Sequence, residues 1–288
     1  MQVRDGEAMR EVVALNGGSG KTSLFCFPGA GGEATTFREM ASLIESDHSV
    51  YGIDMQRFLS TDRKFTVEQL ADFCLAAIRR KQARGPYYMC GYSFGALVAY
   101  EVASRLRNNG EGIGVVALID TGNPAFRAQL SSAETTQLER TYVANRLGKY
   151  FRFLTTGDFR AFANSFLALF VSRAGTRTRR LIRSICHAMN RPMPDVFRHN
   201  DRALFDAWRA YNPPVSALPL LLYYEAHRCA EYGGDRTLGW RLCTCGKVDV
   251  ELGSGGHVEM MAPRNVRSFV AKLSGYLAGK DGEPLVLT

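Results

Sequence analysis

No segment of the sequence approaches the roughly 20 consecutive apolar residues that a membrane-spanning helix requires. Residues 1–10 carry charged side chains and lack the apolar stretch of a secretory signal peptide. The seven cysteines form no Cys-x-x-Cys pair, and no set of Cys and His has the spacing of zinc ligands. We therefore expect a cytoplasmic protein without a metal centre.

Acidic side chains are scarce in one part of the chain. Residues 125–212 contain fifteen Arg and Lys but only six Asp and Glu, and this difference accounts for the whole formal net charge of +8. The same segment shows helical patterns without a convincing strand, over about 133–150, 159–173, 176–189 and 195–211. Because neither interleaved aromatic residues nor a known binding motif accompanies the basic residues, they do not indicate a nucleic-acid partner.

Strand and helix patterns alternate on either side of this basic segment. Short apolar runs predict strands over about 11–15, 23–27, 49–53, 87–90, 114–119, 218–224 and 247–252, and helical patterns occupy about 34–44, 65–81, 97–106 and 262–277. Thr66 is a plausible N-cap of the second helix, and the glycine-rich stretch 16–22 predicts a hairpin turn. The alternation is typical of a parallel α/β sheet. We therefore expect one α/β domain over 1–288, with 125–212 inserted as a helical lid.

A nucleophile-elbow pattern stands in the middle of this alternation. The apolar run Tyr87–Cys90 ends at Gly91-Tyr92-Ser93-Phe94-Gly95, and an amphipathic helical pattern follows at once. Between a strand and a helix, Gly-x-Ser-x-Gly places a serine at the tip of a tight turn, where side chains at the glycine positions would collide. The bare pattern arises by chance in about one chain of this length in ten, but the flanking strand and helix favour a catalytic Ser93.

A second glycine-rich loop follows an earlier strand. The stretch Phe25-Cys26-Phe27-Pro28-Gly29-Ala30-Gly31-Gly32 predicts a strand that ends in a flexible loop before a helix. Such a loop can point backbone N–H groups at a ligand, although an ordinary strand–helix turn would look the same. Beside a nucleophile elbow, we expect it to supply one oxyanion donor, the N–H of Ala30, while the N–H of Phe94 supplies the other.

A serine nucleophile needs a base, and the base needs a group that orients it. Of the five histidines, only His227 and His257 lie in loops that follow predicted sheet strands. His257 lies in a glycine-rich loop between the last strand and the last helix, where sheets of this kind carry the base. We therefore expect His257 to be the base, with His227 as the alternative.

The orienting acid has three candidates. Asp120 closes the strand after the elbow helix, so it is expected beside Ser93 at the carboxyl edge of the sheet, where ligands bind. Glu225 closes the next strand, and Asp235 lies farther along the chain. Asp120 could also cap the turn Asp-Thr-Gly-Asn-Pro that it begins. We expect Asp120 to be the acid and keep Glu225 as its competitor.

Taken together, these stretches resemble the thioesterase family of the α/β-hydrolase fold that serves nonribosomal peptide and polyketide synthases. The matching segments extend over about residues 12–277 and comprise 25–32, 91–96, 117–120, Leu238-Gly239-Trp240 and Gly255-Gly256-His257. The resemblance implies that Ser93 is the nucleophile, His257 the base and Asp120 its partner. It also implies that Ala30 and Phe94 donate their N–H groups to the oxyanion.

The same resemblance implies a reaction and a partner. Such enzymes take an acyl or peptidyl chain from the phosphopantetheine thiol of a carrier protein onto serine, without a cofactor of their own, and pass it to water or to an internal nucleophile. Carrier proteins are usually acidic, so basic lid residues could steer docking. The candidates are Arg173, Arg177, Arg179, Arg180 and Arg183. A solvated helix face would carry the same charges.

Several functions stay open at this point. A proofreading (type II) thioesterase that removes aberrant acyl groups would show the same residues. So would an acyltransferase with an amine or alcohol acceptor, a carboxylesterase or a lipase. A non-catalytic binding module is disfavoured, because candidates for all three members of a Ser, Asp and His set are present.

Overall fold

The computed structural model describes residues 11–18, 20, 22–45, 47–59, 64–129, 201–257 and 259–279. Within these ranges seven strands form one sheet in the order β1-β3-β2-β4-β5-β6-β7. The strands are β1 (Val12–Ala14), β2 (Thr22–Phe27), β3 (His48–Ile53), β4 (Tyr87–Tyr92), β5 (Ile113–Ile119), β6 (Leu220–Glu225) and β7 (Val248–Gly253). Only β1 runs antiparallel to its neighbour, so the predicted parallel α/β sheet is confirmed.

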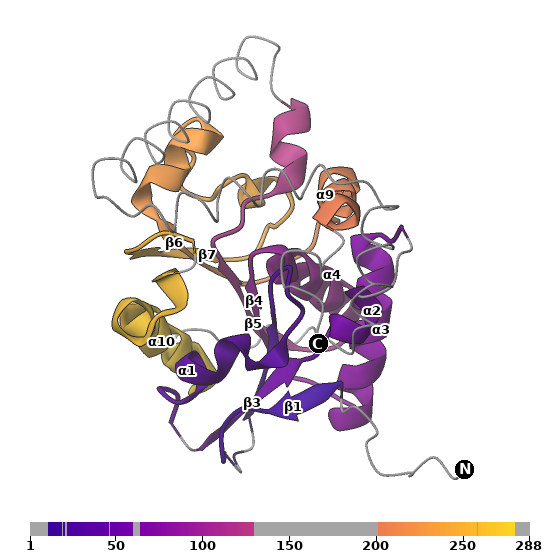
Figure 1. The fold of residues 1–288 in the computed structure, drawn as a ribbon, viewed down its shortest axis with the longest axis vertical. Coiled ribbons are helices and arrows are strands. Elements are labelled where there is room, and N and C mark those ends of the chain that lie inside the picture. The colour runs from indigo at the N-terminus through magenta and orange to yellow at the C-terminus, as the bar shows by residue number, and fades with distance from the viewer. Residues whose placement is uncertain are drawn as a thin grey trace, which may run out of the picture.

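Helices cover both faces of this sheet (Figure 1). The α-helices are α1 (Arg38–Ala41), α2 (Gln56–Leu59), α3 (Val67–Lys81), α4 (Phe94–Asn108), α9 (Asp201–Ala210) and α10 (Pro263–Leu277). Short 3-10 turns occur at η1 (Ala34–Phe37), η2 (Pro124–Gln129), η3 (Ala226–Tyr232), η4 (Trp240–Leu242) and η5 (Glu259–Met261). In this part of the chain no helix is both long and apolar enough to cross a bilayer.

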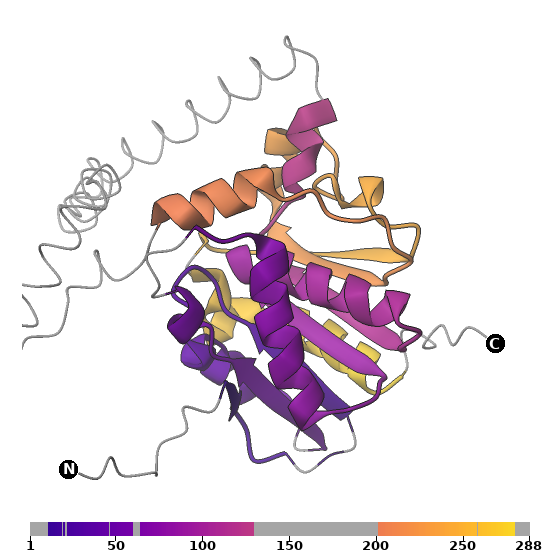
Figure 2. The ribbon, with the colours of Figure 1, turned by 90° about the vertical axis from the view of Figure 1, so that its right-hand side faces the viewer.

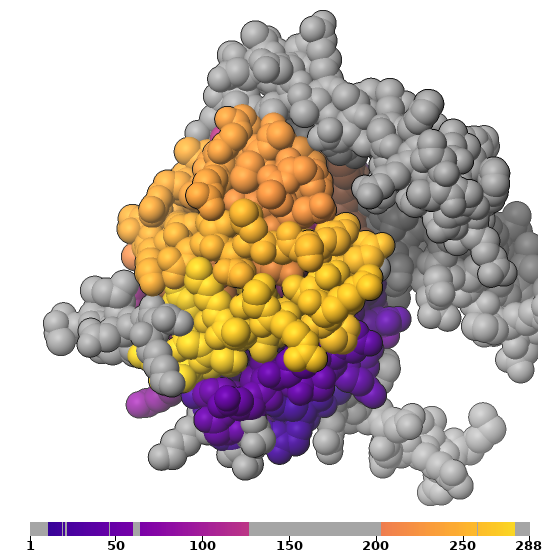
Figure 3. Space-filling model, turned by 90° about the vertical axis from the view of Figure 1, so that its left-hand side faces the viewer, coloured from indigo at the N-terminus to yellow at the C-terminus, as the bar shows by residue number. Residues whose placement is uncertain are grey.

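The two faces of the sheet carry separate hydrophobic cores because side chains alternate along each strand. In β2, Phe25 and Phe27 point into the core under α3 and α4, whereas Leu24 and Cys26 point into the core under α1 and α10. Figure 2 shows the α3 and α4 side with α9 above it, and Figure 3 shows the opposite side, formed largely by α10 and its neighbours. Strand β5 is buried along its whole length, as expected for a central strand covered on both faces.

The predicted N-cap of α3 is confirmed. The hydroxyl of Thr66 accepts a hydrogen bond from the N–H of Gln69 at 3.3 Å, and the Gln69 side chain accepts one from the N–H of Thr66 at 3.2 Å. This reciprocal pair satisfies two N–H groups that have no acceptor within the helix. It explains why the helix begins at Val67, close to the predicted start.

The hairpin predicted over 16–22 is wrong, because β1 pairs with β3 and not with β2. The side chain of Asn16 donates to the carbonyl of His48 and accepts from the N–H of Val50, both at 2.9 Å. These bonds tie the stretch after β1 to β3, which lies between β1 and β2. The same side-chain oxygen of Asn16 also accepts from the N–H of Gly18 at 3.3 Å.

The helix predicted over 34–44 is also shorter than expected. It consists of η1 followed by the single turn α1, which ends at Ala41. The hydroxyls of Thr36 and Ser42 donate to carbonyls three residues earlier, each at 2.7 Å. The backbone N–H of Leu43 likewise bonds three residues back, to Met40. Such i to i−3 bonds favour the tighter 3-10 turn over a continuing α-helix.

Most of the basic insertion lies outside the described residues. The helices predicted over 133–150, 159–173 and 176–189 lie there, as do all five arginines proposed for carrier docking. Helix α9 falls within the last predicted helical stretch, 195–211. Just beyond it, the hydroxyl of Tyr211 donates to the buried carboxylate of Glu101 on α4 at 2.9 Å. The boundaries of the domain and of the lid stay predictions.

Candidate active site

Strand β4 leads directly into Ser93, which lies in a sharp turn before α4. Its backbone has φ 53° and ψ −125°, a conformation that non-glycine residues adopt only under constraint. Two hydrogen bonds supply that constraint: the N–H of Ser93 donates to the carbonyl of Ile119 at 2.9 Å, and the hydroxyl of Thr121 donates to the carbonyl of Ser93 at 2.6 Å. The side chain is thereby held at the carboxyl edge of the sheet.

The packing around the elbow leaves no room for a side chain at either of its two glycines. A Cβ added to Gly91 would overlap the backbone of Ala96 at the start of α4. A Cβ added to Gly95 would overlap the carbonyl oxygen of Pro28, in the loop that follows β2. The helix can therefore lie close to both the elbow strand and the glycine-rich loop only because these positions have no side chain.

The structure brings together the serine, histidine and aspartate that the sequence singles out. The Oγ of Ser93 lies 3.0 Å from Nε2 of His257, and Nδ1 of His257 lies 2.5 Å from Oδ2 of Asp120. With the proton on Nδ1, the imidazole donates to the carboxylate and accepts from the serine hydroxyl. This arrangement allows the imidazole to take the proton of Ser93 as the hydroxyl attacks an electrophile.

Asp120 lies at the end of β5 with φ 50°, and its N–H donates to the carbonyl of Tyr223 at 2.7 Å. Its side chain is only 6% exposed. Burial opposes ionisation, but the hydrogen bond with His257 and the charge of Arg228 outweigh it, so the pKa of the Asp120 carboxyl lies below its ordinary value. The group is therefore an ionised acceptor for the imidazole at neutral pH.

His257 is held by contacts to its backbone and to its ring. The hydroxyl of Tyr92, the residue before the serine, donates to the carbonyl of His257 at 2.7 Å. The Tyr92 ring also stacks on the imidazole, with centroids 4.9 Å apart. Burial, with the nearby charges of Asp120 and Glu259, raises the pKa of Tyr92 to about 12, so its hydroxyl remains a donor over the physiological range.

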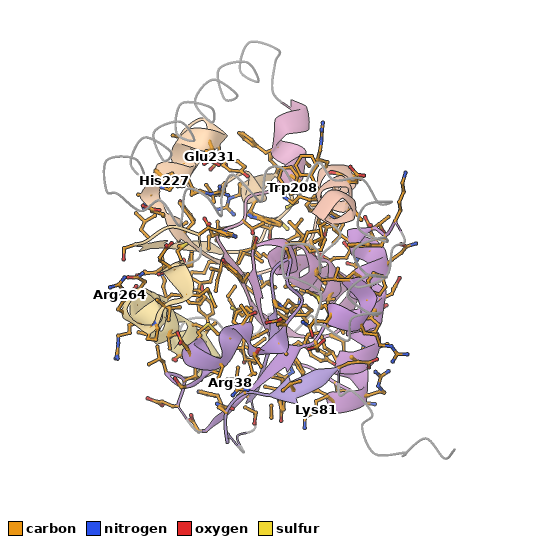
Figure 4. All side chains as sticks on the ribbon, viewed as in Figure 1. Arg38, Lys81, Trp208, His227, Glu231 and Arg264 are labelled. Atoms are coloured by element: carbon orange, nitrogen blue, oxygen red, sulfur yellow. The ribbon has the colours of Figure 1, made fainter. Side chains whose placement is uncertain are left out.

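The competing acids and the competing base have other partners. Glu225, the last residue of β6, pairs with His227, with 3.2 Å between Oε2 and Nδ1, and both side chains are substantially exposed. Figure 4 labels His227 on the segment after β6. The carboxylate of Asp235 accepts from the N–H groups of Thr237 and Gly239 at 2.7 and 2.8 Å. None of these three side chains contributes to the hydrogen bonds that join Ser93, His257 and Asp120.

Both expected oxyanion donors lie in segments beside the serine, one in a loop and one at the start of α4. Phe94 is the first residue of α4, so its N–H has no acceptor within the helix. Ala30 is exposed in the loop after β2, next to Gly29, where an added Cβ would lie 3.4 Å from Cβ of Ser93. Among the described residues, no hydrogen bond uses either N–H group. Their part in an oxyanion hole stays a prediction.

The stretch 238–240 supports the loop that follows Asp120. The indole N–H of Trp240, which is fully buried, donates to the carbonyl of Thr121 at 2.8 Å. The side chain of Asn123 donates to the carbonyl of the glycine before Trp240 at 2.9 Å. Because Thr121 also holds the carbonyl of Ser93, this stretch restrains the elbow indirectly.

Arg228 is a residue of this site that sequence reasoning missed. It lies on η3, and its Nε is 3.2 Å from Oδ1 of Asp120. A guanidinium is neither the acid nor the base of a triad, so the residues expected at the strand ends do not include it. The available signal was its place three residues beyond Glu225, at the edge where the other site residues gather.

In the described part of the chain, no three His, Cys, Asp or Glu side chains are grouped so as to hold a metal ion.

Comparisons with known proteins identify the family of the chain. A model of the thioesterase domain family matches residues 22–275. The chain is 33% identical over 117 residues to vanchrobactin synthetase VabF of Vibrio anguillarum, covering 40% of this chain and 4% of that protein. It is 35% identical over 116 residues to enterobactin synthase component F of Escherichia coli strain K12, covering 39% and 9% respectively. The chain thus spans only a small part of these relatives.

A solved structure extends the likeness over nearly the whole fold. The type II thioesterase BorB from the borrelidin biosynthetic cluster superposes with a TM-score of 0.58 at 17% identity, over 95% of this chain and 98% of that one. At that identity the likeness shows the fold alone. With the family match over residues 22–275, it follows that the chain belongs to the thioesterase domain family, with the α/β-hydrolase fold and a hydrolase activity on thioesters.

Proposed function

We propose that this thioesterase releases an acyl or peptidyl chain from the phosphopantetheine thioester of a carrier protein, through an acyl-enzyme on Ser93. The observation that carries the proposal is the continuous set of contacts from Ser93 to His257 to Asp120. The relatives also include nonribosomal peptide synthetase pngA of Aspergillus terreus, which supports a substrate of nonribosomal peptide synthesis.

The contacts support a first half of the reaction in which Ser93 is the nucleophile. As Oγ of Ser93 attacks the thioester carbonyl, Nε2 of His257 takes its proton, and the carbonyl oxygen becomes an oxyanion. The N–H groups of Ala30 and Phe94 would bind that oxygen, and losing one such donor typically costs about 3 kcal/mol of transition-state stabilisation. The carbon–sulfur bond then breaks, and the pantetheine sulfur leaves as a thiol with the proton from His257.

The second half repeats these steps with a different nucleophile. Water, or a hydroxyl or amine within the bound chain, gives a proton to Nε2 of His257 and attacks the ester carbonyl on Ser93. The ester bond breaks, and Oγ regains the proton. Water yields a free acid, whereas an internal nucleophile yields a ring. In both halves Asp120 stabilises the imidazolium, which forms twice per turnover.

Mass spectrometry after incubation with an acyl-phosphopantetheinyl carrier protein tests this proposal. We expect the mass of the acyl group to appear on the peptide containing Ser93 and to decline as product accumulates. The same protein incubated with the unacylated carrier is the control. Tight binding of the acylated carrier without any adduct or product would contradict an acyl-enzyme and favour a binding module.

We further propose that the acidic carrier protein docks on the basic segment, at Arg173, Arg177, Arg179, Arg180 and Arg183. The support is the charge pattern of the sequence, because opposite charges steer diffusional encounter at low ionic strength. The proposal concerns only carrier-bound substrates. A small thioester carries no acidic domain and does not need such steering.

Reversing two of these charges should separate docking from chemistry. Arg179→Glu with Arg180→Glu is expected to lower kcat/KM for a carrier-bound thioester at low salt by about tenfold, within the range of electrostatic steering. Hydrolysis of a small acyl thioester should be unchanged. The matched control is Arg264→Glu with Arg267→Glu, which reverses two exposed charges on α10. Unchanged kcat/KM for the carrier-bound substrate would remove the docking proposal.

A further inference from the structure

An arginine lies against the carboxylate that orients the imidazole. Asp120 uses Oδ2 to contact His257, while its second oxygen, Oδ1, lies 3.2 Å from Nε of Arg228. The geometry is that of an ion pair rather than of an aligned hydrogen bond. The Arg228 side chain is 24% exposed, and Asp120 is 6% exposed, so water screens the pair weakly. A guanidinium keeps its proton in proteins, so the positive charge is permanent.

A second acid holds this arginine in place. Glu231 accepts a hydrogen bond from Nη1 of Arg228 at 2.9 Å, and its side chain is 13% exposed. Both residues lie on η3, which begins directly after β6, and Figure 4 shows Glu231 on that segment near His227. The result is a row of charged contacts from Glu231 through Arg228 and Asp120 to His257, across the ends of β5, β6 and β7.

Other charged and titratable groups also face this row. His227 lies on the same segment and is paired with Glu225, and its charge contributes to lowering the pKa of the Asp120 carboxyl. The phenol of Tyr92 and the carboxylate of Glu259 lie on the side of β4 and η5. Among the described residues, Arg228 contacts the Asp120 carboxylate with a permanent positive charge.

We propose that Arg228 is a positioning residue of the triad, which turns the Asp120 carboxylate toward His257 and, through its positive charge, opposes the uptake of a proton by that pair. This inference rests on the proposed function, since it assigns Arg228 a part in the same reaction. Without Arg228, Oδ1 of a buried carboxylate loses its counter-charge, and that is costly for an ionised group. The carboxylate could then rotate or protonate, and either change would weaken its support of the imidazole.

The positive charge of Arg228 predicts the direction in which the pH dependence of catalysis changes when the charge is removed. A neighbouring positive charge opposes protonation of a coupled carboxylate and imidazole, and such a pair titrates as one unit. Removing the charge therefore raises the pH at which the pair takes up a proton. The base must be free of that proton to act, so the acid limb of the kcat/KM profile should move to higher pH. Removing the negative charge of Glu231 should move it to lower pH.

Kinetics with a small acyl thioester, such as an acyl-N-acetylcysteamine, measure this shift. Arg228→Met is expected to raise the midpoint of the acid limb by about 0.5 to 1 pH unit, at or just below the lower end of the range for a charge in direct contact. Activity below the limb should fall by up to about tenfold and recover above it, because one pH unit is a factor of ten. Arg228→Lys keeps the charge and should keep the wild-type midpoint more closely, whereas Glu231→Gln should lower it.

The matched control is Arg38→Met, which removes the same charge from an exposed position on α1, far from Glu231 in Figure 4. Its acid limb should coincide with that of the wild-type protein. A role of Arg228 in folding alone would lower activity equally at every pH and leave the midpoint in place. Coincident midpoints for Arg228→Met and wild type would overturn the inference.

NMR titration of the His257 imidazole, assigned with the variant His257→Gln, gives a readout that needs no turnover. If the wild-type protein hydrolyses no thioester but the NMR midpoint rises in Arg228→Met, the proposed function fails and the role of Arg228 stands. If Arg228→Met does not fold, as judged by circular dichroism, the midpoint measured for Glu231→Gln becomes the test of the inference. A midpoint that is unchanged or raised in Glu231→Gln would then overturn the inference.

Discussion

Replacing Ser93 by alanine is expected to lower kcat for thioester hydrolysis by about 10⁴- to 10⁶-fold, the range seen when a triad nucleophile is removed. The loss is large because the imidazole and its carboxylate then have no hydroxyl to activate. The acyl adduct on the peptide containing residue 93 should vanish as well. Single-turnover kinetics and mass spectrometry of the same samples would measure both effects.

The variant Ser93→Ala should fold, since the contacts that hold the elbow come from backbone groups. The N–H of residue 93 still donates to Ile119, and Thr121 still donates to its carbonyl. Ser104→Ala is a matched control, because it removes a fully buried serine hydroxyl from α4 without touching the elbow. Hydrolysis by Ser93→Ala at a rate close to wild type would show that another group is the nucleophile.

Adding His257→Ala to Ser93→Ala should cost little more than either change alone. Members of a triad act as a unit, so once one is absent the others have little left to contribute. The residual rate would come from substrate binding and from the expected oxyanion donors, the N–H groups of Ala30 and Phe94. Independent, multiplicative losses in the double variant would indicate that the two side chains do not act in one proton-transfer step.

The gathering of Ser93, Asp120 and His257 could be predicted because topology constrains it. In a parallel sheet the carboxyl ends of neighbouring strands meet at one edge. Strands β4, β5, β6 and β7 are adjacent in that order, so a residue that closes any of them lies near the serine. Apolar runs and the glycines of the elbow are enough to locate those strands, and the predicted alternation of strand and helix is confirmed.

Contacts that depend on side-chain direction could not be predicted in the same way. The hairpin expected at 16–22 failed because β3, which comes later in the chain, pairs with both β1 and β2 and lies between them, where it also bonds to the amide of Asn16. Arg228 was missed because its role depends on which way η3 turns after β6, and periodicity carries no information on that turn. For the same reason the sequence left two candidates for the orienting acid: Asp120 and Glu225 both close strands at the same edge, and only the direction of their side chains separates them.

Replacing Asp120 by asparagine is expected to lower kcat by about 10⁴-fold while leaving the protein folded. The amide would occupy nearly the same space but would favour the wrong imidazole tautomer, in which Nε2 carries the proton and cannot accept from Ser93. It would also remove the negative charge that stabilises the imidazolium. Measuring kcat and the melting temperature together would separate this effect from loss of structure.

Glu225→Gln is the matched comparison, because it also converts a carboxylate at the end of a strand into an amide. Its partner is His227, and both side chains are exposed enough that the pair should contribute little. We expect kcat within about threefold of the wild-type value, as for other solvated ion pairs. If Glu225→Gln proved the more damaging change, Asp120 would lose its place as the orienting acid. The 2.5 Å contact with His257 would then describe a resting arrangement that the reaction does not use.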